Sequence, residues 1–128
     1  PSRRPPAMPH ILLIDDESSI RELLQEMLVP QGYRVTGVES ALEASAVFSA
    51  DPPDLIITDL QLEETDGFAV IDQAKAVLPD TPIILLTGVL FDRAVIMNLH
   101  EGKIAAYLEK TTPLQEILAE IRRHLPSN

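Results

Sequence analysis

The 128-residue sequence contains no cysteine, and aromatic residues make up only 4% of it. The lack of cysteine excludes disulfide bonds and thiol chemistry and agrees with a reducing cytosol. No apolar run approaches the roughly 18 residues that a membrane-spanning helix needs, and residues 11–14 are too few for the apolar core of a signal peptide. We therefore expect a cytoplasmic globular protein whose core is built from Leu, Ile, Val and Ala side chains.

Positive charge is also scarce, because 20 acidic residues against 10 basic ones leave a formal net charge of −10. A surface of this sign repels nucleic-acid phosphates and anionic lipids, so we expect neither direct nucleic-acid binding nor membrane binding. His10, His100 and His124 are scattered along the chain and have no cysteine partners. This composition argues against a zinc site.

Apolar runs alternate with helix-like segments after a proline-rich start. We expect residues 1–8 to form a disordered or extended arm or linker and residues 9–126 to form a single domain. The alternation is typical of repeated βαβ units and predicts an α/β fold with parallel strands. The five predicted strands are residues 11–14, 35–38, 55–57, 83–86 and 105–108.

The segments between these strands carry helix signals. Capping boxes of Ser19 with Glu22 and of Ser40 with Glu43 predict the starts of the first two helices, and Gly32 should end the turn after the first. The last helix should have Thr112 as its N-cap and Pro113 at its first position. The predicted apolar positions are Ile20, Leu23, Leu24, Met27 and Leu28 in the first helix, Leu42, Ala46 and Val47 in the second, Phe68, Ile71 and Leu78 in the third, and Leu114, Ile117, Leu118, Ile121 and Leu125 in the last.

The helix predicted after Gly88 is apolar on almost every side. We expect it either to be deeply buried or to meet a partner with its outer face, and dimerisation through this face is a further hypothesis. Its apolar residues are Leu90, Phe91, Ala94, Val95, Ile96, Met97 and Leu99.

Five polar residues follow the predicted strand ends, namely Asp15 and Asp16, Asp59, Thr87 and Lys110. In an open sheet of right-handed βαβ units these ends meet at one edge, where ligands bind. Carboxylates about 5 Å apart repel by about 3 kcal/mol per pair at an effective dielectric constant of about 20, so the cluster needs a hard divalent cation. Few protein ligands, with room for water, suit Mg²⁺ better than Ca²⁺.

The same residues meet the demands of phosphoryl transfer, in which a protein mainly positions groups and neutralises charge. Mg²⁺ would bind one phosphoryl oxygen, Lys110 another, and the Thr87 hydroxyl with nearby backbone amides the third. Asp59 is then the predicted nucleophile, because it follows an apolar strand and faces the metal.

From His10 to Leu125 the chain resembles the receiver domain of two-component response regulators. The motifs that carry the resemblance are Ile14-Asp15-Asp16-Glu17, Ile57-Thr58-Asp59-Leu60, Asp66-Gly67, Leu86-Thr87-Gly88 and Tyr107-Leu108-Glu109-Lys110. The resemblance implies a flavodoxin-like, doubly wound five-stranded parallel sheet of order 2-1-3-4-5 with five flanking helices. It also implies that a histidine kinase or phosphotransfer protein phosphorylates Asp59, with Mg²⁺ bound by Asp15, Asp16, Asp59 and the Gln61 carbonyl.

A conformational switch is a further implication of the resemblance. Thr87 would move toward the phosphoryl group and Tyr107 would turn inward, so that the face of the fourth helix, fifth strand and fifth helix changes its affinity for an output domain or partner protein. The domain would catalyse only its own phosphoryl transfer and autodephosphorylation, so it would not be an enzyme with a separate substrate. A receiver-like docking module without phosphorylation is the main alternative. A phosphatase or nucleotide-binding domain is a lesser one, since the first strand lacks a glycine-rich phosphate loop.

Three departures from the family pattern affect these expectations. Glu63 replaces the usual proline after the phosphoacceptor, and Lys110 is followed by Thr111-Thr112-Pro113 instead of directly by proline. The segment 102–107 is one residue longer than the common pattern, which bears on the assignment of Tyr107. Gln61 and Val89 occupy the positions that tune phosphoryl lifetime in the family, and the apolar Val89 predicts slow self-dephosphorylation.

Overall fold

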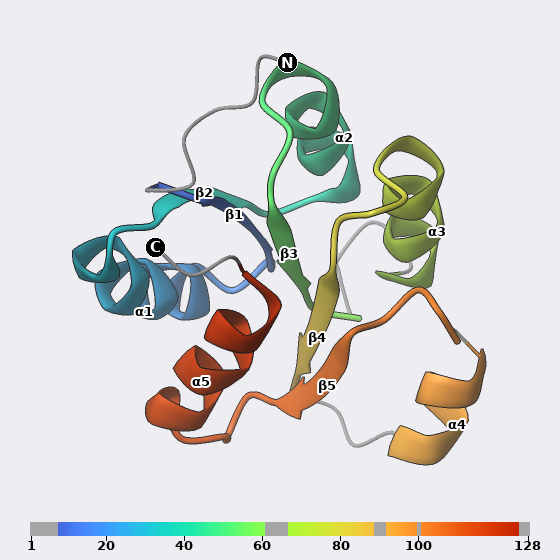
Figure 1. The fold of residues 1–128 in the computed structure, drawn as a ribbon. Helices are drawn as coiled ribbons and strands as arrows, with labels where there is room; N and C mark the ends of the chain where they lie inside the picture. Colours follow the sequence, from blue (N-terminus) through green and yellow to red (C-terminus); the bar gives the residue numbers. More distant parts are fainter. Residues whose placement is uncertain (1–7, 61–66, 89–91, 100, 126–128) are drawn as a thin grey trace.

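The computed structural model describes residues 8–60, 67–88, 92–99 and 101–125. Its strands are β1 (His10–Ile14), β2 (Arg34–Val38), β3 (Leu55–Thr58), β4 (Ile83–Thr87) and β5 (Ala106–Glu109). They form one parallel sheet in the order β2-β1-β3-β4-β5 (Figure 1). The predicted flavodoxin-like, doubly wound architecture is therefore confirmed. The predicted arm lies outside the described residues except for Met8.

The helices lie on both faces of this sheet. They are α1 (Ser18–Leu28), α2 (Ala41–Ala50), α3 (Gly67–Val77), α4 (Arg93–Leu99) and α5 (Leu114–His124), with a short 3₁₀ turn at Val29–Gln31. Helices α1 and α5 cover one face, and α2, α3 and α4 lie on the other (Figure 1). Because all four strand pairs are parallel, every strand points its carboxyl end to the same edge of the sheet.

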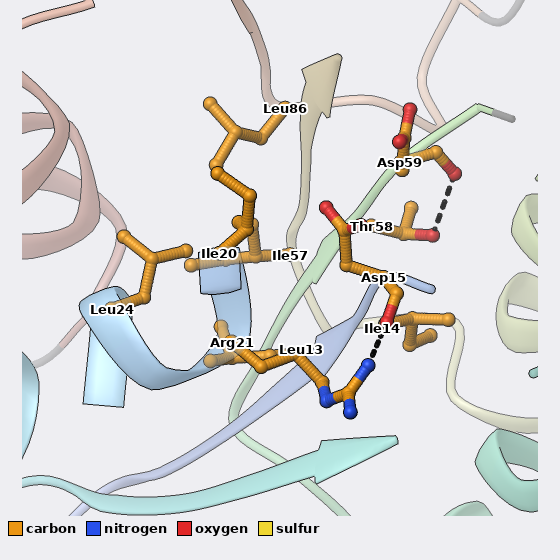
Figure 2. Close-up of a pocket in the computed structure, with 10 residues that line it drawn as sticks. All are labelled: Leu13, Ile14, Asp15, Ile20, Arg21, Leu24, Ile57, Thr58, Asp59 and Leu86. Carbon is orange, nitrogen blue, oxygen red and sulfur yellow. Dashed lines mark hydrogen bonds between the residues drawn. The ribbon is translucent and has the colours of Figure 1, made fainter. Parts of the chain in front are cut away.

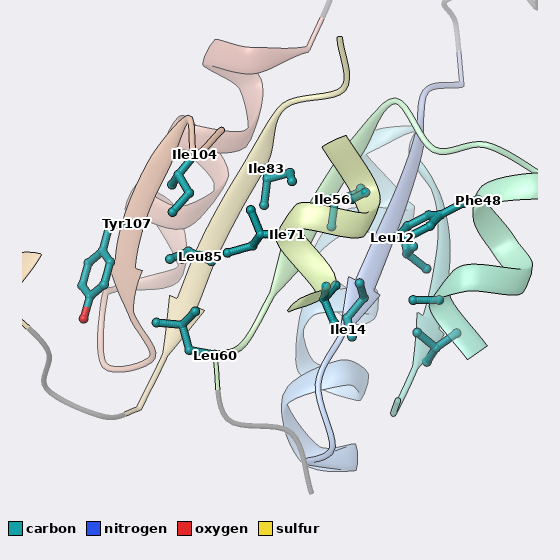
Figure 3. Packing of buried hydrophobic residues seen from close by; sticks show 14 of the residues in the cluster. Leu12, Ile14, Phe48, Ile56, Leu60, Ile71, Ile83, Leu85, Ile104 and Tyr107 are labelled. Atoms are coloured by element: carbon teal, nitrogen blue, oxygen red, sulfur yellow. The ribbon is translucent and has the colours of Figure 1, made fainter. Parts of the chain in front are cut away.

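Each face of the sheet carries its own apolar core. In β1, Leu12 and Ile14 pack toward α2 and α3, whereas Ile11 and Leu13 pack toward α1 and α5. All four side chains are buried, because β1 is central and is covered on both sides. Figure 3 shows the first of these clusters, from Phe48 of α2 across the sheet to Tyr107 of β5.

The two predicted capping boxes have different outcomes. In α2 half of the predicted box is present, because the Ser40 side chain accepts a hydrogen bond from the Glu43 N–H at 3.2 Å. The Glu43 carboxylate accepts the N–H of Glu39, one residue before the N-cap, at 2.8 Å. In α1 the prediction is wrong, because the helix begins at Ser18 and Glu17 is its N-cap. The reason is Asp15, whose carboxylate accepts the Glu17 N–H at 2.9 Å and starts the helical turn earlier than Ser19 would.

The core-facing side of α2 also differs from the prediction. Of the predicted positions, Leu42 is 81% exposed and Ala46 is exposed, whereas Val47 is half-buried and packs against the core. Ala44 and Phe48 are buried. Apolar side chains lie on every side of this helix, so periodicity does not select one face. We attribute the observed face to the bulkier Phe48, which buries more apolar area than Leu42 would.

The last helix largely follows the sequence. Helix α5 begins at Leu114 with Pro113 as its N-cap, one residue later than predicted, because the Pro113 carbonyl accepts the first helical hydrogen bonds, from the Glu116 and Ile117 N–H groups at 2.9 and 3.1 Å. Its buried residues are Ile117, Leu118 and Ile121, as the stripe predicts.

Helix α4 is buried on one side only. Ile96 is buried, whereas Ala94 is exposed and Val95 is 51% exposed. Leu90 and Phe91 lie outside the described residues. Within the ranges that the structure describes, no helix combines the length and apolar character needed to cross a membrane.

Candidate functional site

The strand register brings two carboxylates side by side. Ile14 at the end of β1 pairs with Thr58 at the end of β3, so that Asp15 and Asp59 are the next residue on each strand. Backbone bonds fix both positions, because the Asp15 N–H donates to Val38 and the Asp59 N–H donates to the Ile14 carbonyl, each at 3.0 Å. The strand order reverses between β1 and β3, which is where open α/β sheets bind ligands.

The neighbouring strand ends add a hydroxyl and an ammonium group. Thr87 is the last residue of β4 and is fully buried. The Lys110 N–H donates to the Thr87 carbonyl at 2.9 Å, which holds the backbone of Lys110 just beyond β5. Residues from four different strand ends therefore converge at one edge, as the sequence predicts.

The Lys110 ammonium lies among three carboxylates. Its Nζ is 2.9 Å from Asp15 Oδ2 and 2.8 Å from Asp59 Oδ2, and it also donates to Glu17 Oε1. Asp15 and Asp59 side chains are only 7% and 6% exposed, and that of Lys110 is 10% exposed. Such burial removes most of the solvent screening, so these charges depend strongly on one another.

The pKa shifts reflect this dependence. Burial raises the pKa of the Asp15 carboxyl, and the nearby Asp59 charge acts in the same direction, although the Glu17 N–H and Lys110 oppose it. For Lys110, burial acts to lower the pKa, but hydrogen bonds to Asp59, Glu17 and Asp15 together outweigh it and raise the pKa above its ordinary value. The lysine therefore stays charged, while the carboxylates carry more negative charge than one ammonium neutralises.

The donor set fits a hard divalent cation. Oxygen atoms of Asp15, Glu17 and Asp59 all lie within 4.8 Å of one another. Carboxylate oxygens are the ligands that Mg²⁺ prefers, and three negative charges against one ammonium leave room for its charge. This cluster can hold a metal ion.

Comparison with known proteins agrees with the site. A sequence model of the response regulator receiver domain matches residues 11–122. The chain belongs to this family. The response regulator MprA of Mycobacterium ulcerans (strain Agy99) is 32% identical over 112 residues, which are 88% of this chain and 48% of MprA. Other curated relatives are matched over 18% of their length, so the chain spans at most about half of these proteins.

Solved receiver structures also resemble this one. The signal receiver domain of an HD domain-containing protein from Pseudomonas fluorescens Pf-5 is 30% identical, with a TM-score of 0.85, and the match covers 97% of this chain and 91% of that domain. The response regulator TrrA of Thermotoga maritima, solved in complex with Mg²⁺ and BeF, is 29% identical with a TM-score of 0.79, over 92% of this chain and all of TrrA.

The acidic group of this receiver domain differs from the predicted metal set. Glu17 belongs to it, and the sequence reasoning missed this residue although it directly follows Asp15 and Asp16. Asp16 is half-buried and is not a member of the group, so its role as a ligand stays a prediction. The predicted ligand Gln61 lies outside the described residues, as do Val89 and Glu63.

The two predicted switch residues occupy buried positions in this receiver domain. Tyr107 is 4% exposed and pairs in register with Leu85 of β4. Its ring belongs to the cluster that includes Leu60 and Ile104 (Figure 3). Tyr107 lies within strand β5, which runs from Ala106 to Glu109. The movement of Thr87 and Tyr107 stays a prediction.

A small apolar pocket lies beneath the carboxylates of the receiver domain. It lies between α1 and the ends of β1 and β3, and Asp15 and Asp59 form its polar rim (Figure 2). Arg21 of α1 donates from its guanidinium to the Asp15 carbonyl at 2.6 Å, which ties the helix to the loop that carries Asp15. Apolar side chains make up most of the remaining wall, so the two carboxylates are shielded from water on this side.

Proposed function

We propose that this receiver domain accepts a phosphoryl group on Asp59 in a Mg²⁺-dependent reaction and that phosphorylation changes its affinity for a partner. One observation carries the proposal. The buried Lys110 ammonium bridges Asp15 and Asp59 at 2.9 and 2.8 Å, which places a fixed positive charge beside the predicted nucleophile. The docking-module alternative gives this buried, mutually dependent charge set no purpose.

Asp59 acts as the nucleophile in the proposed reaction. One of its carboxylate oxygens forms a bond to phosphorus, and the bond between phosphorus and the donor's imidazole nitrogen breaks, with the electron pair remaining on that nitrogen. The Lys110 ammonium neutralises charge on one phosphoryl oxygen and the Thr87 hydroxyl donates a hydrogen bond to another as the charge spreads over them. Asp15 and Asp59, with Glu17 of the same acidic group and the predicted ligands Asp16 and Gln61, would hold Mg²⁺, which would supply further charge neutralisation. The domain catalyses only its own phosphorylation and autodephosphorylation.

The proposed output is a change in the surface formed by α4, β5 and α5. Thr87 moves toward the phosphoryl group and Tyr107 adjusts behind it, so that one of two packed arrangements is favoured. The exposed side of α4 around Ala94 and Val95 is part of this surface and is also the proposed site of homodimerisation.

The proposed partners follow from the site and from the relatives. A histidine kinase or phosphotransfer protein in the cytoplasm donates the phosphoryl group. Several relatives are named transcriptional regulatory proteins and are much longer than the matched segment, so we propose that this domain controls an output domain or a partner protein. With a net charge of −10, the domain itself binds neither nucleic acid nor membranes.

Phosphorylation by a small-molecule donor tests the proposal directly. The purified protein is incubated with acetyl phosphate and either Mg²⁺ or EDTA, and intact mass is measured. We expect the wild type to gain the mass of one phosphoryl group in Mg²⁺ but not in EDTA. The variant Asp59→Asn should gain no mass in either. The matched control is Asp72→Asn, which removes an exposed carboxylate and should be phosphorylated normally. The proposal would be refuted if Asp59→Asn were phosphorylated or if the wild type were not.

A further inference from the structure

We propose that Glu17 is a positioning residue that holds Lys110 in the unphosphorylated domain and must release it before the lysine can serve the phosphoryl group. The inference rests on the proposed function and assigns a regulatory role within the same site. In this role Glu17 competes with the incoming phosphoryl oxygens for the ammonium group.

The hydrogen-bonding capacity of Lys110 is the basis for the competition. An ammonium group has three N–H donors. In the structure Nζ contacts three carboxylates, from Asp15, Asp59 and Glu17, which match this number. A phosphoryl oxygen can therefore bind Lys110 fully only if one of these contacts is given up.

Burial determines which contact yields. In the metal-free domain, before Asp59 is phosphorylated, the Asp15 and Asp59 side chains are 7% and 6% exposed, so separating either from the ammonium would leave a buried charge unpaired. The Glu17 side chain is 54% exposed and can return to water at little cost. Glu17 is thus the partner that Lys110 can exchange most easily.

The position of Glu17 permits this exchange without a change of the backbone. The Glu17 N–H is bound to the Asp15 carboxylate at 2.9 Å, and its carbonyl accepts the Arg21 N–H at 3.2 Å. Glu17 is the N-cap of α1, so its main chain is fixed by the helix. Only the side chain has to rotate, from the ammonium into solvent.

Two opposite effects of Glu17→Gln follow. Without the competing carboxylate, Lys110 is more available, and the phosphorylation rate constant at saturating Mg²⁺ should rise about two- to fivefold, the range expected for one exposed ion pair. At the same time the cluster loses one of its three negative charges, so Mg²⁺ should bind more weakly. A merely structural role would lower both quantities together.

The matched control is Glu26→Gln, which makes the same charge change at an exposed position farther along α1. For wild type and both variants, acetyl phosphate rate constants are measured at Mg²⁺ concentrations that saturate each protein, and Mg²⁺ affinity is measured by calorimetry. In EDTA, the Lys110 Cε and Nζ signals are compared by NMR spectroscopy. We expect faster phosphorylation, weaker Mg²⁺ binding and a shifted Lys110 signal for Glu17→Gln alone.

Three results would overturn the inference while the wild type is phosphorylated normally. They are an unchanged or slower rate in Glu17→Gln, equal changes in Glu26→Gln, and an unshifted Lys110 signal. A wild type that gains no phosphoryl group would instead refute the proposed function itself, and the metal-free Lys110 signal would still show whether Glu17 holds the ammonium.

Discussion

Replacing Lys110 with methionine tests whether the ammonium holds the acidic site together. The substitution keeps the length of the side chain but removes the charge that Asp15 and Asp59 share. Breaking a buried ion pair by removing one partner costs about 3 to 5 kcal/mol, because the remaining charge is left uncompensated. Lys110 is 10% exposed and one of its three carboxylates reaches solvent, so we expect the lower value, about 3 kcal/mol in the free energy of unfolding.

Urea unfolding in EDTA measures this loss, and Lys103→Met is its control. Lys103 makes a 2.8 Å ion pair with Asp72 in which both side chains are exposed, so its loss should cost at most about 1 kcal/mol. Saturating Mg²⁺ should narrow the difference between Lys110→Met and wild type, because the cation neutralises the same carboxylates. The prediction would be refuted if the two substitutions lowered the free energy of unfolding equally. It would also be refuted if Mg²⁺ did not reduce the destabilisation caused by Lys110→Met.

Three further predictions concern stability. Burial raises the pKa of the Asp15 carboxyl above its ordinary value of 3.8. The stability that the protonated carboxyl contributes is therefore present below that value and is lost as the pH rises through the raised pKa. Asp15→Asn should then stabilise the metal-free domain at neutral pH, and urea midpoints should show that this gain vanishes below about pH 4. Phe48→Ala should cost about 3 to 5 kcal/mol and Leu42→Ala less than about 0.5 kcal/mol, and equal losses would contradict the observed face of α2. Gly32→Ala should lower the thermal midpoint of unfolding by the equivalent of about 1 kcal/mol, because Gly32 has a φ of 95°, which alanine adopts only with strain. An unchanged midpoint would contradict this and show that the turn relaxes to avoid the strain.

The fold was predictable from the sequence because strand and helix signals agree with the tertiary structure almost everywhere. Buried parallel strands such as Ile83–Thr87 are continuous apolar runs, and helix α5 has a single apolar stripe around Ile117 and Ile121. The predicted face of helix α2 was only partly right, because Val47 packs against the core but Leu42 and Ala46 do not. A helix that is apolar on every side offers no periodicity from which to choose its buried face. Its orientation depends on how Phe48 packs against the sheet, which is a tertiary effect.

The site was predictable where strand ends determine it and unpredictable where a flexible side chain does. Asp15, Asp59, Thr87 and Lys110 are placed by strand register, which topology fixes. Glu17 belongs to a helix N-cap instead, and its carboxylate reaches the site only through the direction of its side chain. The early start of α1, caused by the Asp15 carboxylate, determines that direction, and no spacing rule in the sequence indicates it.

The most direct test of the account identifies the residue that carries the phosphoryl group. After reaction with acetyl phosphate and Mg²⁺, the acyl phosphate is reduced with borohydride to a stable derivative, and the modified residue is located by peptide mass spectrometry. We expect modification at Asp59 alone and none in EDTA. Modification at Asp15, Asp16 or Glu17, or an equal yield without Mg²⁺, would contradict it.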